Sequence, residues 1–248
     1  MQRLILGLAI AIFASCSDSG KPALTDLRSG DLMLATDASR LDSATAAAGF
    51  GAISGSCGVL DEALWQDSAP KLFDNHLDFA DRSFSADQLS EEARRILSEG
   101  TAGGSSGVSE AMAFELLRRC EGAQLLLSET KIGYQDANGK KTDLLVQIDG
   151  RSIGVSVTRG YHFPPNEPYT AAEARALWQK KLSDLPLSQK NAQPSNAWQR
   201  SVLAILAVDK QAADLLTQVY KNEIDAQTKG DAIVLLTITD GQDQMIYQ

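Results

Sequence analysis

The stretch Thr142-Asp-Leu-Leu-Val-Gln-Ile-Asp-Gly-Arg-Ser-Ile-Gly-Val-Ser-Val-Thr-Arg159 decides the fold class of this chain. It contains two short apolar runs joined by Asp149-Gly150, a dipeptide typical of tight β-hairpin turns. The acidic residue Asp143 enters the first run. The stretch therefore predicts two antiparallel strands with a carboxylate at the start of the first.

The N-terminal residues have the pattern of an export signal. Arg3 precedes an apolar run, 4–13, that is too short to cross a bilayer, and small residues follow. Phe13-Ala-Ser-Cys16 resembles a bacterial lipobox, although Phe13 departs from the usual Leu. This resemblance implies lipid on Cys16 and an exported protein tethered to the outer membrane or cell envelope, without a transmembrane helix. An ordinary secretory signal is the alternative.

Length and composition indicate one domain of moderate size with an N-terminal extension. The chain has 248 residues, of which 44% are hydrophobic, enough for a packed core. We expect a signal peptide over 1–15, a lipidated flexible tether over 16–58, a helical extension over 59–104 and an α/β domain over 105–248.

The charge of the chain is acidic overall but unevenly placed. The net charge is −9, which argues against broad, nonspecific binding of nucleic acid. Residues 18–110 contain 16 acids and 7 bases, whereas residues 140–200 contain 5 acids and 9 bases. The basic segment weakens the objection to a nucleic-acid partner.

The cysteines and histidines give little sign of a metal site. After Cys16 only Cys57 and Cys120 remain, and export would permit a disulfide between them. Two buried free thiols are the alternative. The chain has two histidines, His76 and His162, and no zinc-site spacing.

Periodicity and cap signals predict the order of elements. A helix over 90–99 begins at Ser85 or Ser90, and a Gly-rich break at 100–107 follows. The remaining elements are a helix over 109–120, strands over 125–134, 142–148 and 152–157, a helix over 171–182, a helical region over 196–226 and a strand over 231–238. The core order is αβββαβ.

This order resembles the common core of the PD-(D/E)XK nuclease-like superfamily, over roughly residues 109–240. The most specific part of the resemblance is Asp143 together with Gly154-Val-Ser-Val-Thr-Arg159. It implies a restriction-endonuclease-like α/β fold, with a mixed sheet flanked by helices. The chain is also similar to a set of bacterial and eukaryotic proteins without assigned activity that share Gly-Val-Ser-Val, Lys180-Lys181-Leu182 and the Trp198-to-Leu203 spacing.

The resemblance implies Mg²⁺-dependent cleavage of phosphodiester bonds, with Asp143 and Glu110 as metal ligands. Carboxylate oxygens suit this hard cation, which activates water and stabilises charge on the phosphate. Ser156 and Thr158 occupy the positions at which such nucleases carry Glu and Lys. Ser156 is a neutral ligand at best, and Thr158 cannot replace a cation.

Some superfamily members carry the catalytic lysine on the next helix, so Lys180 and Lys181 are candidates for the lysine that is absent at Thr158. Arg159 is a poor replacement, because it points to the other face of the strand from Thr158. Glu129-Thr-Lys131 also spells Glu-x-Lys, but no suitably spaced Asp precedes it. We therefore expect Glu129 at a solvent-facing strand edge.

Each candidate also has a structural explanation. Asp143 could cap a turn, Glu110 could interact with the helix dipole, and Lys180 and Lys181 could form a solvated helix end. A catalytically inactive nuclease fold, retained as a binding or surface interaction module, is therefore the alternative to a nuclease. An exported toxin or immunity-type protein is a third hypothesis.

Overall fold

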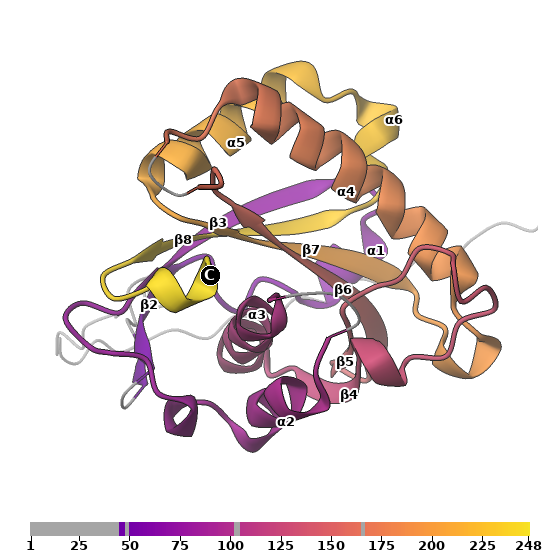
Figure 1. Ribbon diagram of the computed structural model, residues 1–248. Helices are drawn as coiled ribbons and strands as arrows, with labels where there is room; N and C mark the ends of the chain where they lie inside the picture. Colours follow the sequence, from indigo (N-terminus) through magenta and orange to yellow (C-terminus); the bar gives the residue numbers. More distant parts are fainter. Residues whose placement is uncertain (1–44, 48–49, 102–104, 165–166) are drawn as a thin grey trace, which may run out of the picture. The chain divides into compact units, whose positions relative to one another are not determined.

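The computed structural model describes residues 45–248, apart from 48–49, 102–104 and 165–166. In these residues the chain is α/β, with an eight-stranded mixed sheet and helices on both faces (Figure 1). The strands are β1 (Thr45–Ala47), β2 (Gly51–Gly55), β3 (Lys71–Asp78), β4 (Gln124–Ser128), β5 (Leu144–Ile148), β6 (Arg151–Gly160), β7 (Arg200–Ala207) and β8 (Ile233–Asp240). The helices are α1 (Glu62–Gln66), α2 (Glu91–Glu99), α3 (Gly107–Glu121), α4 (Ala171–Asn191), α5 (Lys210–Glu223) and α6 (Ala226–Lys229), with 3₁₀ turns η1 (Ala86–Gln88), η2 (Glu129–Lys131), η3 (Pro194–Asn196) and η4 (Gln244–Ile246).

The strand order is β1-β2-β3-β8-β7-β6-β5-β4. The four central strands β3, β8, β7 and β6 are parallel, and the pairs at both edges are antiparallel. Helices α4 and α5 are the crossovers from β6 to β7 and from β7 to β8. The predicted hairpin around Asp149-Gly150 is confirmed as β5–β6.

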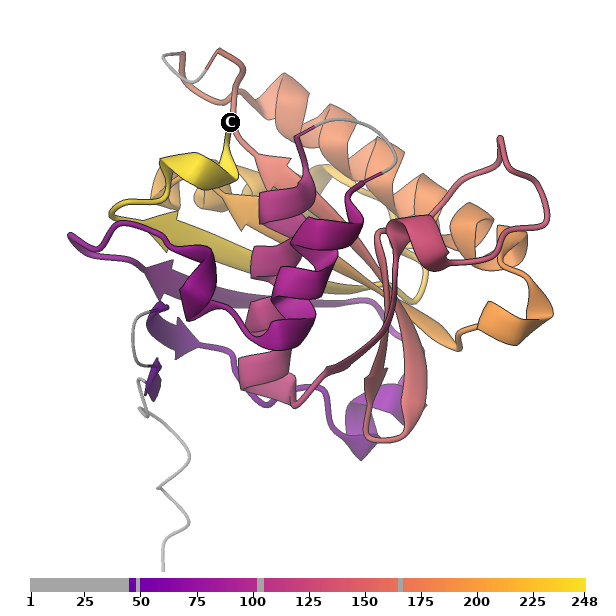
Figure 2. The ribbon, with the colours of Figure 1, turned by 60° about the horizontal axis from the view of Figure 1, so that its bottom comes forward.

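Two apolar cores cover the two faces of the sheet. On one face, α3 contributes Met112 and Phe114 to a core that includes Val155 of β6. On the other face, Trp178 of α4 packs with Leu203 of β7 and residues of α5. Figures 1 and 2 show α2 and α3 on the face opposite α4 and α5. Strand residues alternate between these cores, as the period of a β-strand requires.

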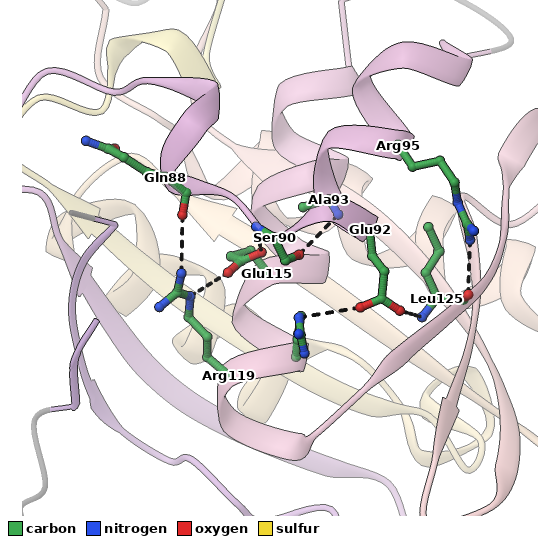
Figure 3. Close-up of polar contacts among 9 residues, drawn as sticks. Gln88, Ser90, Glu92, Ala93, Arg95, Glu115, Arg119 and Leu125 are labelled. Carbon is green, nitrogen blue, oxygen red and sulfur yellow. Dashed lines mark hydrogen bonds and ion pairs between the residues drawn. The ribbon is translucent and has the colours of Figure 1, made fainter. Parts of the chain in front are cut away.

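Polar side chains join α2 to α3 and to the edge strand β4 (Figure 3). The buried carboxylate of Glu115 in α3 accepts hydrogen bonds from the backbone N–H of Ser90, at the start of α2, at 2.9 Å and from Nε of Arg119 at 2.6 Å. Glu92 accepts a hydrogen bond from the backbone N–H of Leu125, and Arg95 donates one to its carbonyl oxygen. Helix α2 therefore satisfies backbone groups of an edge strand that would otherwise be open to another strand.

The prediction of a helical extension over 59–104 is wrong. This region contains α1 and α2 but also β3, which lies between β2 and β8 in the sheet. Its pairing with β8 joins residues that are about 160 positions apart, such as Lys71 and Ile233. Because that partner is remote, local periodicity does not reveal the strand.

The prediction of a helical region over 196–226 is also wrong in its first part. Residues 200–207 form β7, in which every residue is buried, and α5 begins at Lys210. A short apolar run that is buried on both faces has no alternation to distinguish it from a buried helix. The corrected order from α3 to β8 is αβββαβααβ.

A disulfide joins Cys57, after β2, to Cys120 near the end of α3. This resolves the two alternatives for these cysteines in favour of the bridge. The predicted signal peptide, Cys16 and most of the predicted tether lie outside the described residues. Within the described part of the chain, no helix has the length and apolar character needed to span a membrane.

Candidate metal centre

Three carboxylates from three different elements meet beside the β5–β6 hairpin. Glu110 comes from the first turn of α3, Glu129 from η2 and Asp143 from the residue before β5. One oxygen of each lies within 4.8 Å of the others. The two predicted metal ligands, Glu110 and Asp143, are thus brought together, and Glu129 joins them.

The sheet itself positions Asp143. Its backbone N–H donates to the carbonyl oxygen of Val155 at 3.1 Å. Its carboxylate accepts hydrogen bonds from the N–H of Val157 at 2.6 Å and from the Ser156 hydroxyl at 3.1 Å. Burial raises the pKa of Asp143, and the positive charge of Lys181 opposes this shift.

Glu110 is a buried carboxyl group that has no hydrogen-bond partner within the described ranges. Its side chain is 1% exposed, and neither of its oxygens accepts a hydrogen bond from the described residues. Burial, followed by the negative charge of Asp143, raises the pKa of Glu110 to about 7. The Ser106 hydroxyl opposes the rise, although its geometry falls short of a hydrogen bond. An ionised carboxylate here is costly unless a cation or a proton compensates it.

Of the two candidate lysines, Lys181 reaches the site. Its Nζ donates to the carbonyl oxygen of Val157 at 2.9 Å, while the N–H of Val157 donates to Asp143. The charge of Lys181 also opposes the pKa rise of Glu110. Lys180 is exposed, because neighbouring residues of a helix point in different directions.

The other residues of the second strand have separate roles. The buried Ser156 uses its hydroxyl to hydrogen-bond Asp143. Thr158 is half-buried two residues further along β6. Arg159 donates to the carbonyl oxygens of Ile246 and Gln248, so its guanidinium is committed to the C-terminal segment.

The expectation that Glu129 lies at a solvent-facing strand edge is wrong. Strand β4 ends at Ser128, and the 3₁₀ turn that follows turns Glu129 into the acidic cluster, where it is half-buried. The sequence signal was the Glu-x-Lys spelling at 129–131. No suitably spaced Asp precedes this motif, because Asp143 follows it in the chain.

The segment between Glu129 and Asp143 is held by hydrogen bonds at both of its sides. The Tyr134 hydroxyl accepts from the N–H of Thr142 and donates to its carbonyl oxygen. Asn191, at the end of α4, donates to the carbonyl oxygens of Asp136 and Lys140. These contacts fix the loop that joins the two carboxylates.

Comparison with known proteins gives one relative and no function. The chain is 34% identical over 152 residues to the "AAC-rich mRNA clone AAC4 protein" of Dictyostelium discoideum, over 59% of this chain and 22% of the relative. The match thus spans about a fifth of the relative's length, and that name states no activity. No family model matches the chain. No solved structure matches it either.

Proposed function

We propose that this α/β domain is a metal-dependent phosphodiester hydrolase that acts on nucleic acid. The observation that carries the proposal is Glu110, a buried carboxyl group that has no hydrogen-bond partner among the described residues and lies against a second carboxylate, Asp143. Two carboxylates this close repel each other when both are ionised, and a bound cation removes the repulsion. A bound cation is therefore the simplest explanation for the carboxylates of Glu110 and Asp143 lying this close together.

Mg²⁺ fits the donor set, because it prefers carboxylate oxygens and retains several waters. Glu110 and Asp143 would hold it. When bound, the ion would activate water and stabilise negative charge on the phosphate. The hydrogen bonds from Val157 and Ser156 would orient the carboxylate of Asp143 toward it.

Lys181 would provide the positive charge that Thr158 lacks. It is half-buried beside the cluster and anchored to β6, so its ammonium is held close to Asp143. Such a group can bind a substrate phosphate or orient the attacking water. Lys141, two residues before Asp143 in the sequence, is exposed and would attract a polyanion in spite of the net charge of the chain.

The order of elements supports a restriction-endonuclease-like core. The segment α3-β4-β5-β6-α4-β7 has the αβββαβ order of that superfamily, with β7 as its last strand. The proposal also keeps the lipid tether on Cys16, which rests on the lipobox resemblance, and so places the domain at the cell envelope.

Substitution of Asp143 tests the proposal. Asp143→Ala and the isosteric Asp143→Asn should abolish Mg²⁺-dependent cleavage of DNA and RNA oligonucleotides, because each removes a ligand charge. Asp214→Ala, an exposed acid on α5, is the matched control and should cleave like the wild type. Melting curves would show that the variants are folded.

Undiminished cleavage by both Asp143 variants would contradict the assignment. A wild-type protein that turns over no phosphodiester with Mg²⁺ or Mn²⁺ would instead favour the inactive binding module.

A further inference from the structure

We infer that Glu129 is a third ligand of the metal centre and replaces the carboxylate that is missing at Ser156. The inference rests on the proposed function and adds a residue to its site. The family pattern has this carboxylate on β6, at the position of Ser156. In this chain the carboxylate beside Asp143 belongs to Glu129.

Two residues from neighbouring segments lie beside Asp143, which directly precedes β5. In the β5–β6 pair Leu144 is opposite Val155, and Ser156, the next residue of β6, donates its hydroxyl to the carboxylate of Asp143. In the β4–β5 pair Leu144 is opposite Ser128, and Glu129 is the next residue, in the 3₁₀ turn η2. Glu129 and Ser156 therefore flank the same carboxylate from the two neighbouring segments. A carboxylate moved from one flank to the other stays beside Asp143.

The contacts of the two flanking residues support this exchange. The Ser156 hydroxyl donates its hydrogen bond to Asp143 and brings no charge. Glu129 brings a carboxylate oxygen within 4.8 Å of those of Asp143 and Glu110. Oxygens of three carboxylates lie within 4.8 Å of one another, and one of them belongs to Glu110, which is buried and has no hydrogen-bond partner in the part of the chain that the structure describes. That convergence is the arrangement expected of a divalent-cation site with oxygen ligands.

The experiment removes the carboxylate at position 129 and then introduces one at position 156. Binding of Mn²⁺ to the full-length chain is measured by titration calorimetry for the wild type, for Glu129→Gln and for Glu129→Gln combined with Ser156→Glu. Glu129→Gln should weaken Mn²⁺ binding by about tenfold or more, on the scale known for perturbed metal ligand shells. The double variant should recover most of that loss, because it restores a carboxylate beside Asp143. Asp214→Asn is the control for an acid-to-amide change on the surface and should bind Mn²⁺ like the wild type.

Two further variants keep the outcome decisive. A glutamate at position 156 must fit a buried site, so Glu129→Asp is measured in parallel and should bind more tightly than Glu129→Gln. Wild-type affinity in Glu129→Gln, together with lost affinity in Asp143→Asn, would overturn the role of Glu129 and leave the proposed function intact. A wild-type chain that binds no Mn²⁺ would overturn both.

Discussion

At the residue scale, the carboxyl group of Glu110 makes the stability of the metal-free protein depend on pH. Its pKa is about 7 in the folded state, against an ordinary value of 4.5. Between these values the folded state keeps a proton that the unfolded state has lost. The free energy of unfolding therefore falls as the pH rises from about 4.5 through 7.

Glu110→Gln should remove this fall in the free energy of unfolding with rising pH. In EDTA at pH 8 it should raise the free energy of unfolding by about 3 kcal/mol, and at pH 5 by less than about 1 kcal/mol, from the difference between the two pKa values. Urea denaturation at the two pH values measures both. Glu91→Gln, at an exposed position of α2, is the control. An equal effect of Glu110→Gln at both pH values would show that the carboxyl group is not perturbed by its burial.

At the element scale, Gly154 explains why the Gly-Val-Ser-Val pattern accompanies a tryptophan. A Cβ atom at Gly154 would lie 2.4 Å from Cε2 of Trp198, so the indole packs directly on the backbone of β6. The indole Nε1 also donates to Ser201 of β7. The two sequence features are thus one packing contact between β6 and the chain entering β7.

Gly154→Ala should therefore lower the free energy of unfolding by about 1–3 kcal/mol, as overpacking of a tight core does. Chemical denaturation measures the loss, and Ser152→Ala in the same strand should change little. Replacing Trp198 by Phe in the Gly154→Ala background should recover part of the stability. A Gly154→Ala protein as stable as the wild type would mean that the indole moves freely away from β6.

At the scale of the whole molecule, the disulfide joins segments that are 63 residues apart in the sequence. It ties the chain after β2 to the end of α3, whose other end carries Glu110. A cross-link over such a loop restricts the unfolded chain and typically contributes about 2–4 kcal/mol.

Replacing both Cys57 and Cys120 by Ser should lower the free energy of unfolding by about 2–4 kcal/mol. Thermal unfolding with and without a reducing agent gives an internal control. Reduction should lower the midpoint of the wild type and leave the double variant unchanged. A wild type whose midpoint is insensitive to complete reduction would contradict the expected contribution.

Local signals in the sequence are sufficient to predict those elements that depend on contacts between near neighbours. Ser90 caps α2 through a bond to Ala93, and the Asp149-Gly150 turn closes the β5–β6 hairpin. The family resemblance also predicts that Asp143 and Glu110 lie together, as the structure has them. The cap and the turn depend on residues a few positions apart. The placement of Asp143 and Glu110 depends on a motif whose arrangement the family resemblance implies.

The sequence by itself thus determined the starts of α2 and α4, the hairpin and the α/β class, because caps and tight turns are interactions between near neighbours. Only the tertiary structure decided that residues 200–207 form a strand, that β3 enters the sheet, and that Glu129 faces Asp143. Each of these depends on burial or register between segments that are remote in the chain. Such pairing leaves no local period in the sequence.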